Sequence, residues 1–344
     1  MSDIPPVPWS ELSANENPSP PSPRVAAAVV EALAHLNRYP EGEDAALREA
    51  VAGHLGRGLT PAHVVTGSSG SDVLELIARA LLAPGDEVVV SQPTFHVYAS
   101  TARHQQARVV TVPLDPVSLA CDVDGVLGVV TPATRLVYLC NPGNPTGVVV
   151  PNADVEALLA GLPPRVVLVA DEVYVHYVTS PAFPDSIGQV LAGRPVVIVH
   201  SFSKVYALAG LRLGYAVTRP DLAATIGGVR RKFHLGRLDV AAGIAALADQ
   251  EFVRDSVALV HQELPRFYDA FRRLGLTFWP TDANFVLFRA PVDASELVRA
   301  LAARGVKVRT TDGNGLPGHV RVTVGRPEEN QQFVAALSAV LTCA

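Results

Sequence analysis

The sequence predicts an α/β protein, with a large domain built on a mostly parallel sheet sandwiched by helices and a smaller α+β domain. Three observations support this prediction. From about residue 62 to residue 217, short β-branched apolar runs alternate with helical patterns. Near-continuous hydrophobic strands separated by helices are typical of parallel sheets covered on both faces. At 344 residues the chain is also too long for one small core.

The elements of the large domain follow one another along the chain. A strand at His63–Thr66 leads into the turn Gly67–Ser71, and a helix follows whose apolar residues recur on one face. Ala83–Asp86 ends this helix. The further strands that we expect are Glu87–Ser91, Arg108–Val112, Arg135–Cys140, Arg165–Ala170, Val196–Ser201 and Leu213–Val217. In such sheets ligands bind where the carboxyl ends of the strands meet.

The two ends of the chain differ from this middle part. Residues 1–23 are rich in proline and therefore predict an extended arm. After roughly residue 265 the pattern becomes α+β. Its expected elements are the strands Asn284–Arg289, Val306–Arg309 and His319–Val324 and the helices Ser295–Arg304 and Pro327–Leu341. We therefore expect an arm and helix over 1–40 joined to the small domain, a large domain over 41–262 and a small domain over 263–344.

Composition excludes several classes of protein. A net charge of −5 argues against nucleic acid as the main partner. The longest apolar runs have the length of strands, so no membrane span is expected, and the first residues lack the pattern of a secretion signal. The three cysteines are odd in number and lack metal-binding spacing, so we expect reduced thiols, no metal and a cytoplasmic location.

The segment Ser201-Phe202-Ser203-Lys204, with Arg212 eight residues later, carries the most chemistry. A lysine at the end of a buried strand, beside hydroxyl groups and a fixed cation, suits an amine that must lose its proton. Such an amine can attack an aldehyde and form a Schiff base. Two hydroxyls and a guanidinium suit a phosphate. The segment therefore predicts a site for pyridoxal phosphate; the alternative is a surface turn after a core strand.

Two further polar segments follow expected strands. Asn141–Gly147 forms a rigid turn in which Asn144 is placed to donate a hydrogen bond. Asp171 follows an apolar strand, where a buried carboxylate is costly unless it meets a cation such as a protonated pyridine nitrogen. Tyr174, three residues on, could reach the phenolic oxygen of the cofactor. The alternatives are a plain strand-to-helix turn for the first segment and a helix cap for the second.

Two weaker signals point to the same edge of the sheet. The turn Gly67–Ser71 precedes a helix, whose positive end and free N–H groups attract a phosphate. Phe95 follows another strand, where its ring could stack on a flat cofactor, although a core aromatic at a helix start is the usual interpretation. The agreement of all five segments on one edge supports the prediction of a cofactor site there.

Three motifs in this order resemble a known family. They are Asn-Pro-x-Asn-Pro-Thr-Gly, Asp-Glu-x-Tyr and Ser-x-Ser-Lys-x7-Arg, and together they are similar to the pyridoxal-phosphate aminotransferases of classes I and II, with fold type I. The histidinol-phosphate aminotransferase branch is the most similar, on the segments Ala14–Pro18, Arg38–Gly42 and Arg321–Gly325. The resemblance covers nearly the whole chain.

For the cofactor, the resemblance implies a role for each matching residue. Lys204 would form the Schiff base and then move the proton, Asp171 would pair with the pyridine nitrogen, and Asn144 and Tyr174 would bond the ring oxygen. Phe95 would stack on the ring. The phosphate would be held by Ser201, Ser203 and Arg212, helped by Ser69 and Gly70. Tyr39 would reach the phosphate in the partner subunit, which implies a homodimer; the alternative is a packed interface aromatic.

For the substrate, the resemblance implies transfer of an amino group between an amino donor and a 2-oxo acid such as 2-oxoglutarate. Arg321 would bind the α-carboxylate through two parallel hydrogen bonds, unless it is an exposed strand arginine, and Arg309 and Asn15 would assist. The donor would be histidinol phosphate or an aromatic amino acid. Departures at Arg231–Arg237 and Arg326 leave open a specialised donor, a β-lyase or a decarboxylase. Residues 1–40 have no room for the DNA-binding module of related regulators.

Overall fold

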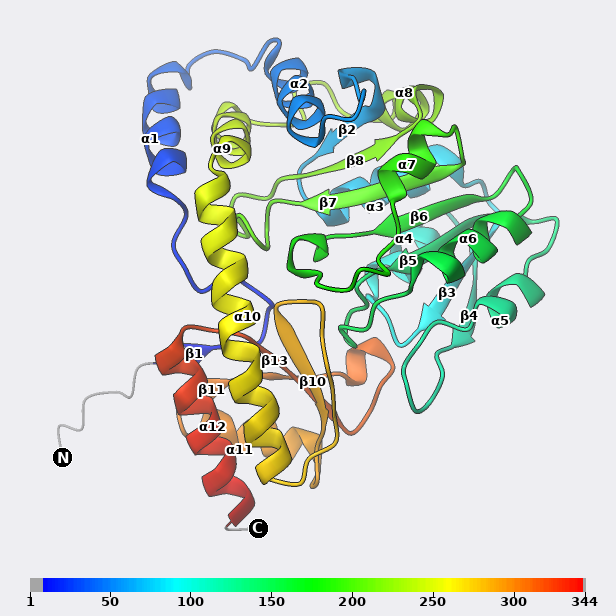
Figure 1. Ribbon diagram of the computed structural model, residues 1–344. Coiled ribbons are helices and arrows are strands. Elements are labelled where there is room, and N and C mark those ends of the chain that lie inside the picture. Colours follow the sequence, from blue (N-terminus) through cyan, green and yellow to red (C-terminus); the bar gives the residue numbers. More distant parts are fainter. Residues whose placement is uncertain (1–8, 343–344) are drawn as a thin grey trace.

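The large part of the molecule is built on one seven-stranded sheet (Figure 1). The computed structural model describes residues 9–342. The strand order across the sheet is β2-β8-β7-β6-β5-β3-β4. These strands are β2 (Val64–Gly67), β3 (Glu87–Gln92), β4 (Arg108–Pro113), β5 (Thr134–Cys140), β6 (Val167–Asp171), β7 (Val196–Ser201) and β8 (Gly214–Thr218).

Six of the seven strands run in the same direction. The seventh, β8, is antiparallel to its neighbours β2 and β7. This confirms the predicted mostly parallel sheet. The register aligns the carboxyl ends of neighbouring parallel strands, since Cys140 pairs with Asp171 and Asp171 pairs with Val199. The polar segments that follow β5, β6 and β7 are therefore brought to one edge.

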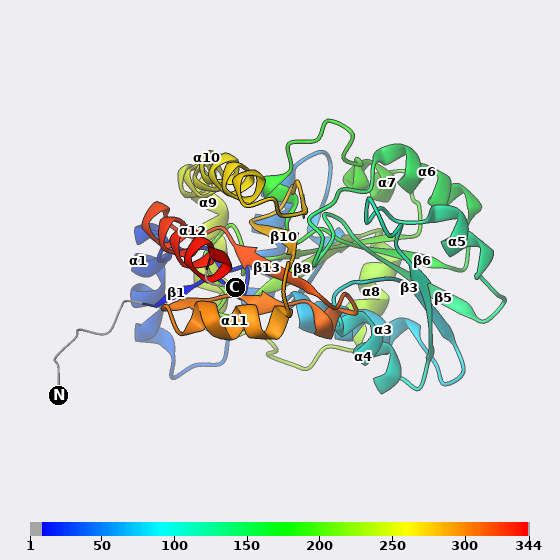
Figure 2. The same cartoon turned by 90° about the horizontal axis from the view of Figure 1, so that it is seen from below.

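Helices cover both faces of the sheet, as Figure 2 shows. On one face lie α3 (Gly70–Leu81), α4 (Val97–His104) and α8 (Pro220–Gly228); on the other lie α5 (Val123–Gly128), α6 (Asn152–Gly161) and α7 (Ser186–Leu191). Side chains alternate along a strand. In β5, Leu136 and Tyr138 therefore enter the core under α3, whereas Val137 and Leu139 enter the core on the opposite face.

The smaller part contains a four-stranded antiparallel sheet of order β12-β13-β10-β9. Its strands are β9 (Phe278–Trp279), β10 (Phe285–Arg289), β12 (Arg309–Thr310) and β13 (His319–Thr323), and its helices are α11 (Ala294–Ala302) and α12 (Pro327–Thr342). The strand predicted over Val306–Arg309 is interrupted. Val306–Lys307 forms β11, which pairs with β1 (Ser10–Glu11), and the chain changes sheets at the buried Val308.

The two parts share long connecting segments. Helix α10 (Gln250–Arg273) runs along both, so the predicted boundary at 262 falls inside this helix (Figure 1). The N-terminal segment pairs with β11 through β1, in a two-stranded sheet of its own, and then forms α1 (Pro23–Ala32), which packs beside α9 (Arg237–Ala248). Helix α2 (Glu43–Leu55) also packs against α9, which lies between α1 and α2 in Figure 1. Of the predicted arm, the prolines before residue 9 lie outside the described residues. The domain boundaries stay a prediction.

Local sequence explains where these helices begin. Pro23 occupies the first turn of α1, where its missing N–H costs nothing, and the Ser22 hydroxyl accepts a hydrogen bond from the Val25 N–H. Within residues 9–342, no helix combines the length and the apolar character that crossing a membrane requires.

Candidate active site

A cavity of about 330 Å³ lies at the carboxyl ends of the large sheet and is closed from the other side by the small part of the molecule. Both sheets and the N-terminal segment supply its walls. The predicted site residues that line it are Asn15, Gly70, Phe95, Asn144, Asp171, Tyr174, Ser201, Ser203, Lys204, Arg212, Arg309 and Arg321. Of the predicted set, Ser69 and Tyr39 lie outside this lining.

Lys204 lies in the loop that follows β7, and its amine faces the cavity. Its Nζ donates a hydrogen bond to the carbonyl of Ala14, 3.1 Å away. Burial, and then the nearby positive charge of Arg321, lower the pKa of the Lys204 amine to about 8. A substantial fraction of this amine is therefore neutral near physiological pH, as a nucleophile or base requires.

Asp171 ends strand β6 and is buried. Burial raises the pKa of its carboxyl to about 6, although the Tyr98 hydroxyl, which donates to its Oδ2 over 2.6 Å, opposes that rise. No lysine, arginine or histidine within residues 9–342 forms an ion pair with Asp171. A buried carboxylate without a cation is costly, so this position suits a bound cationic group.

The cavity wall also gathers hydrogen-bond donors for an anion. Ser201, Ser203 and Arg212 line it together with Gly70 in the first turn of α3. Gly214 allows this close packing, because a Cβ on it would lie 2.5 Å from the backbone nitrogen of Gly70. The Ser69 hydroxyl caps α3 by accepting a hydrogen bond from the Asp72 N–H over 3.0 Å, and its own O–H is left to donate. Ser71, which the sequence did not single out, lines the cavity instead.

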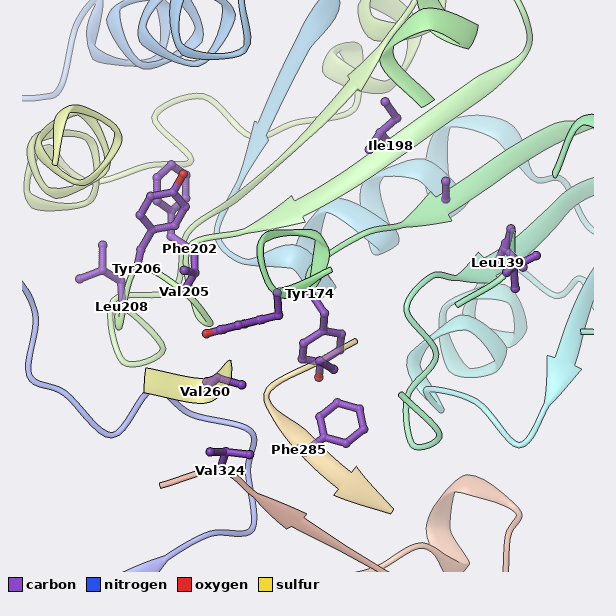
Figure 3. Close-up of a cluster of buried hydrophobic side chains, with 14 of the residues drawn as sticks. Leu139, Tyr174, Ile198, Phe202, Val205, Tyr206, Leu208, Val260, Phe285 and Val324 are labelled. Carbon is purple, nitrogen blue, oxygen red and sulfur yellow. The ribbon is translucent and has the colours of Figure 1, made fainter. Parts of the chain in front are cut away.

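Tyr174 follows β6 and points its hydroxyl toward the N-terminal segment. Asn15 Nδ2 donates to the Tyr174 hydroxyl over 2.9 Å, and the Asn15 backbone N–H donates to the Thr323 hydroxyl. The ring of Tyr174 meets that of Phe285 edge-on, with centroids 5.2 Å apart (Figure 3). Asn15 therefore holds the hydroxyl of Tyr174 from the N-terminal segment, 159 positions away in sequence.

Arg321 lies in the middle of β13 and is 5% exposed, so it is not an exposed strand arginine. Its Nη1 donates to Asn144 Oδ1 over 2.6 Å, and its Nη2 donates to the Ser13 carbonyl over 3.0 Å. Its buried Nε has no hydrogen-bond partner. An unpaired buried donor is costly, and here it lies beside the cavity, where a bound anion can accept from it.

Of the two remaining predicted residues, Arg309 lines the cavity and Tyr39 does not. Arg309 pairs in register with Arg321 across β12 and β13, and both side chains line the cavity. Tyr39 is 75% exposed and stacks on Phe233 with ring centroids 4.9 Å apart, so it does not reach the cavity of its own chain. This placement is compatible with a role in a second subunit.

Several residues at the site were missed by sequence reasoning. Glu16, His96, Cys140 and Asn314 line the cavity, and Tyr98 contacts Asp171 beneath it. Asn314 also donates to the Thr94 carbonyl over 3.0 Å and so ties the small sheet to the loop that carries Phe95. These contacts join residues far apart in sequence, such as the 220 positions between Asn314 and Thr94, and no local pattern indicates them.

The residues fit pyridoxal phosphate. One cavity is lined by a lysine amine with a lowered pKa, by a buried carboxylate without a cation, and by hydrogen-bond donors for a phosphate at a helix N-terminus. These groups suit the aldehyde, the pyridine nitrogen and the phosphate of that cofactor. The fold and the site thus define an enzyme that works through pyridoxal phosphate.

Comparison with known proteins gives the family. Residues 7–337 match the model of aminotransferase class I and II. The chain belongs to this family and is a pyridoxal-phosphate-dependent aminotransferase. It is 43% identical over 331 residues to the histidinol-phosphate aminotransferase of Symbiobacterium thermophilum, with 96% of this chain and 90% of the relative covered. A second histidinol-phosphate aminotransferase, from Moorella thermoacetica, is 38% identical over 96% of this chain and 85% of its own length.

Solved structures agree. A histidinol-phosphate aminotransferase from Sinorhizobium meliloti in complex with pyridoxal-5'-phosphate superposes with a TM-score of 0.87 at 30% identity, covering 97% of this chain and 91% of that chain. An aspartate aminotransferase variant from Thermus thermophilus gives a TM-score of 0.86 at 26% identity, covering 98% of this chain and 97% of that chain. These confirm the predicted fold, cofactor and reaction class.

Proposed function

We propose that the protein transfers the amino group of histidinol phosphate to a 2-oxo acid such as 2-oxoglutarate. The observation that carries the proposal is the pair of guanidinium groups on neighbouring strands. Arg309 and Arg321 lie directly opposite each other on β12 and β13, and both face the cavity that contains Lys204. Like charges at such paired positions are destabilising. An anionic substrate offsets this repulsion.

The chemistry of the donor fits this pair. Histidinol phosphate carries a phosphate ester in place of an α-carboxylate, and two arginine forks match the several oxygens of a phosphate. The 2-oxo acid presents a carboxylate, and the two parallel N–H groups of one guanidinium, that of Arg321, are enough to bind it. One cationic wall therefore serves both substrates in turn. The relatives named histidinol-phosphate aminotransferase support the same donor.

Bound pyridoxal phosphate supplies an electron sink that makes the proton on the substrate α-carbon acidic. The protein groups around it have distinct tasks in our proposal. Lys204, with an amine that is partly neutral near physiological pH, holds and moves the proton at the α-carbon. Asp171 keeps the pyridine nitrogen charged, and Arg321 fixes the substrate so that its C–H bond lies beside Lys204. Asn144 and Tyr174 bond the ring oxygen, and Phe95 stacks on the ring.

The phosphate of the cofactor is held, in this proposal, by Ser201, Ser203, Arg212 and Gly70 with the first turn of α3. Ser69 assists in this proposal from the same turn, which its hydroxyl also caps. We further propose a homodimer in which Tyr39 reaches the phosphate in the partner subunit. Its support is the exposure of Tyr39 together with three exposed apolar side chains on the same segment, Val30, Leu33 and Leu36. A cytoplasmic location stays a prediction from the sequence.

A single-turnover comparison of histidinol phosphate with histidinol tests the substrate. The phosphorylated donor should react faster. Arg309→Ala should lower the ratio of the two rates by about tenfold, which corresponds to the loss of one hydrogen bond to a charged group. Equal rates for the two donors in the wild-type protein would exclude the phosphate as the recognised group. Faster reaction with an aromatic amino acid would identify that class as the donor instead.

A further inference from the structure

Tyr98 is a buried tyrosine that the proposed chemistry does not use. It lies in the first turn of α4, three residues after Phe95, and is 1% exposed. Its ring stacks on Tyr138 with centroids 4.9 Å apart and meets Phe95 edge-on at 5.8 Å. Packing on two sides fixes the ring. The hydroxyl donates to Oδ2 of Asp171 at 2.6 Å, with the Cys140 thiol also close by.

This contact makes the two oxygens of Asp171 unequal. Oδ2 accepts the short hydrogen bond from Tyr98, whereas Oδ1 accepts only a long one, 3.4 Å from the backbone N–H of Val173. The carboxylate borders the cavity. Oδ1 therefore keeps the capacity to accept a further hydrogen bond from a bound group. A single donor placed on one oxygen orients a carboxylate for a ligand on the other.

We propose that Tyr98 is a positioning residue that holds Asp171 as a carboxylate with Oδ1 directed at the ring nitrogen of pyridoxal phosphate. The proposal rests on the cofactor site and is independent of the choice of amino donor. Because Phe95 and Tyr98 come from one short segment, the same turn would place the ring that stacks on the cofactor and the group that orients its acid. Tyr98 does not touch the cofactor in this arrangement and acts through Asp171.

The hydroxyl suits this role because it stays protonated. Burial raises the pKa of Tyr98 well above its ordinary value, and the neighbouring charge of Asp171 raises it further, so it remains a donor. Its hydrogen bond opposes the effect of burial on Asp171, whose pKa is about 6. Removing it should raise that pKa and protonate part of the acid near neutral pH. The other groups that face Asp171 are Cys140, Glu172, Tyr174, His200 and Lys204.

Tyr98→Phe tests the proposal, with Tyr138→Phe as the matched control. Both variants lose one buried tyrosine hydroxyl from the same stacked pair, but Tyr138 makes no hydrogen bond to Asp171. Binding of pyridoxal phosphate to the apoprotein is titrated at several pH values. Tyr98→Phe should bind about tenfold more weakly at neutral pH, with part of the loss recovered as pH rises and Asp171 ionises. Tyr138→Phe should stay within about twofold of wild type.

Three further measurements separate positioning from packing. With ¹⁵N-labelled cofactor, the ring-nitrogen resonance should move toward the unprotonated form in Tyr98→Phe only. Tyr98→His, which returns a ring N–H donor, should bind the cofactor more tightly than Tyr98→Phe. In an Asp171→Ala background, Tyr98→Phe should have no further effect on affinity, because the acid through which it acts is absent.

Three outcomes overturn the proposal. One is that Tyr98→Phe and Tyr138→Phe both bind the cofactor as tightly as the wild-type protein and give the same ring-nitrogen resonance. Another is an equal loss in both variants, which would assign the effect to core packing. The third is an undiminished effect of Tyr98→Phe in the Asp171→Ala background. Failure of the proposed donor looks different, since it would leave cofactor binding by the wild-type protein intact.

Discussion

Substituting Arg321 by lysine keeps the positive charge of the clamp and removes its planar fork. The fork is held in place by Asn144 at Nη1 and by the Ser13 carbonyl at Nη2, and Nε is left without a partner. A lysine ammonium cannot present two parallel N–H groups to a carboxylate. One hydrogen bond from a charged donor contributes about 1.5–3 kcal/mol. Loss of one of the two should lower kcat/KM for 2-oxoglutarate by about 10- to 100-fold.

The assay is steady-state kinetics with 2-oxoglutarate varied at fixed donor, together with a titration of pyridoxal phosphate. Cofactor affinity should fall less than kcat/KM in Arg321→Lys, because in our proposal Arg321 acts on the cofactor only through Asn144. Arg326→Lys is the control, because Arg326 lies five residues on, is exposed, and donates to the Pro18 carbonyl outside the cavity. It should stay within about twofold of wild type. Equal kcat/KM for the two variants would refute the clamp, and a selective loss of cofactor affinity would place Arg321 at the cofactor instead.

Other consequences can be tested alongside. Borohydride reduction followed by mass spectrometry should place the cofactor mass on Lys204, and Lys204→Ala should carry no label; a label on another lysine contradicts the assignment. The rate at which the apoprotein takes up pyridoxal phosphate should rise through about pH 8 and then level off, as the Lys204 amine loses its proton; a flat profile would show that this amine is not the reacting group. Ser22→Ala should lower the free energy of unfolding by about 1 kcal/mol in urea titration, because α1 loses its cap. Mixing Tyr39→Phe with Lys204→Ala subunits should yield hybrid dimers in which the one site that keeps Lys204 receives an intact Tyr39 from the other subunit, so this site should have wild-type activity; activities that simply average the two parents contradict the shared site.

The parallel sheet was predictable because its strands are near-continuous apolar runs, and both faces must be covered when a strand such as Val196–Ser201 has no polar side. The polar residues that follow these strands were predictable for the same reason. Strand ends meet at one edge, so Lys204, Asp171 and Asn144 had to approach one another.

What could not be predicted depends on contacts between distant segments. The sequence around Tyr98 indicates only a core aromatic, because the positioning role that we propose depends on a contact with Asp171, 73 positions later. The Ser69 hydroxyl also caps α3, a second use that the local sequence does not distinguish from binding a phosphate. The strand predicted over Val306–Arg309 is interrupted at Val308, because the residues before Val308 pair with β1 and those after it pair with β13.

The first described stretch of the chain reaches deep into the centre of the enzyme. Carbonyls of Ser13 and Ala14 accept from Arg321 and Lys204, and Asn15 holds Tyr174, while the same stretch adds β1 to β11. Anyone who builds a chimaera by exchanging the C-terminal region with a relative would therefore have to move this leading stretch with it. Otherwise the exchanged Arg321 would have to donate to a Ser13 carbonyl from the other parent.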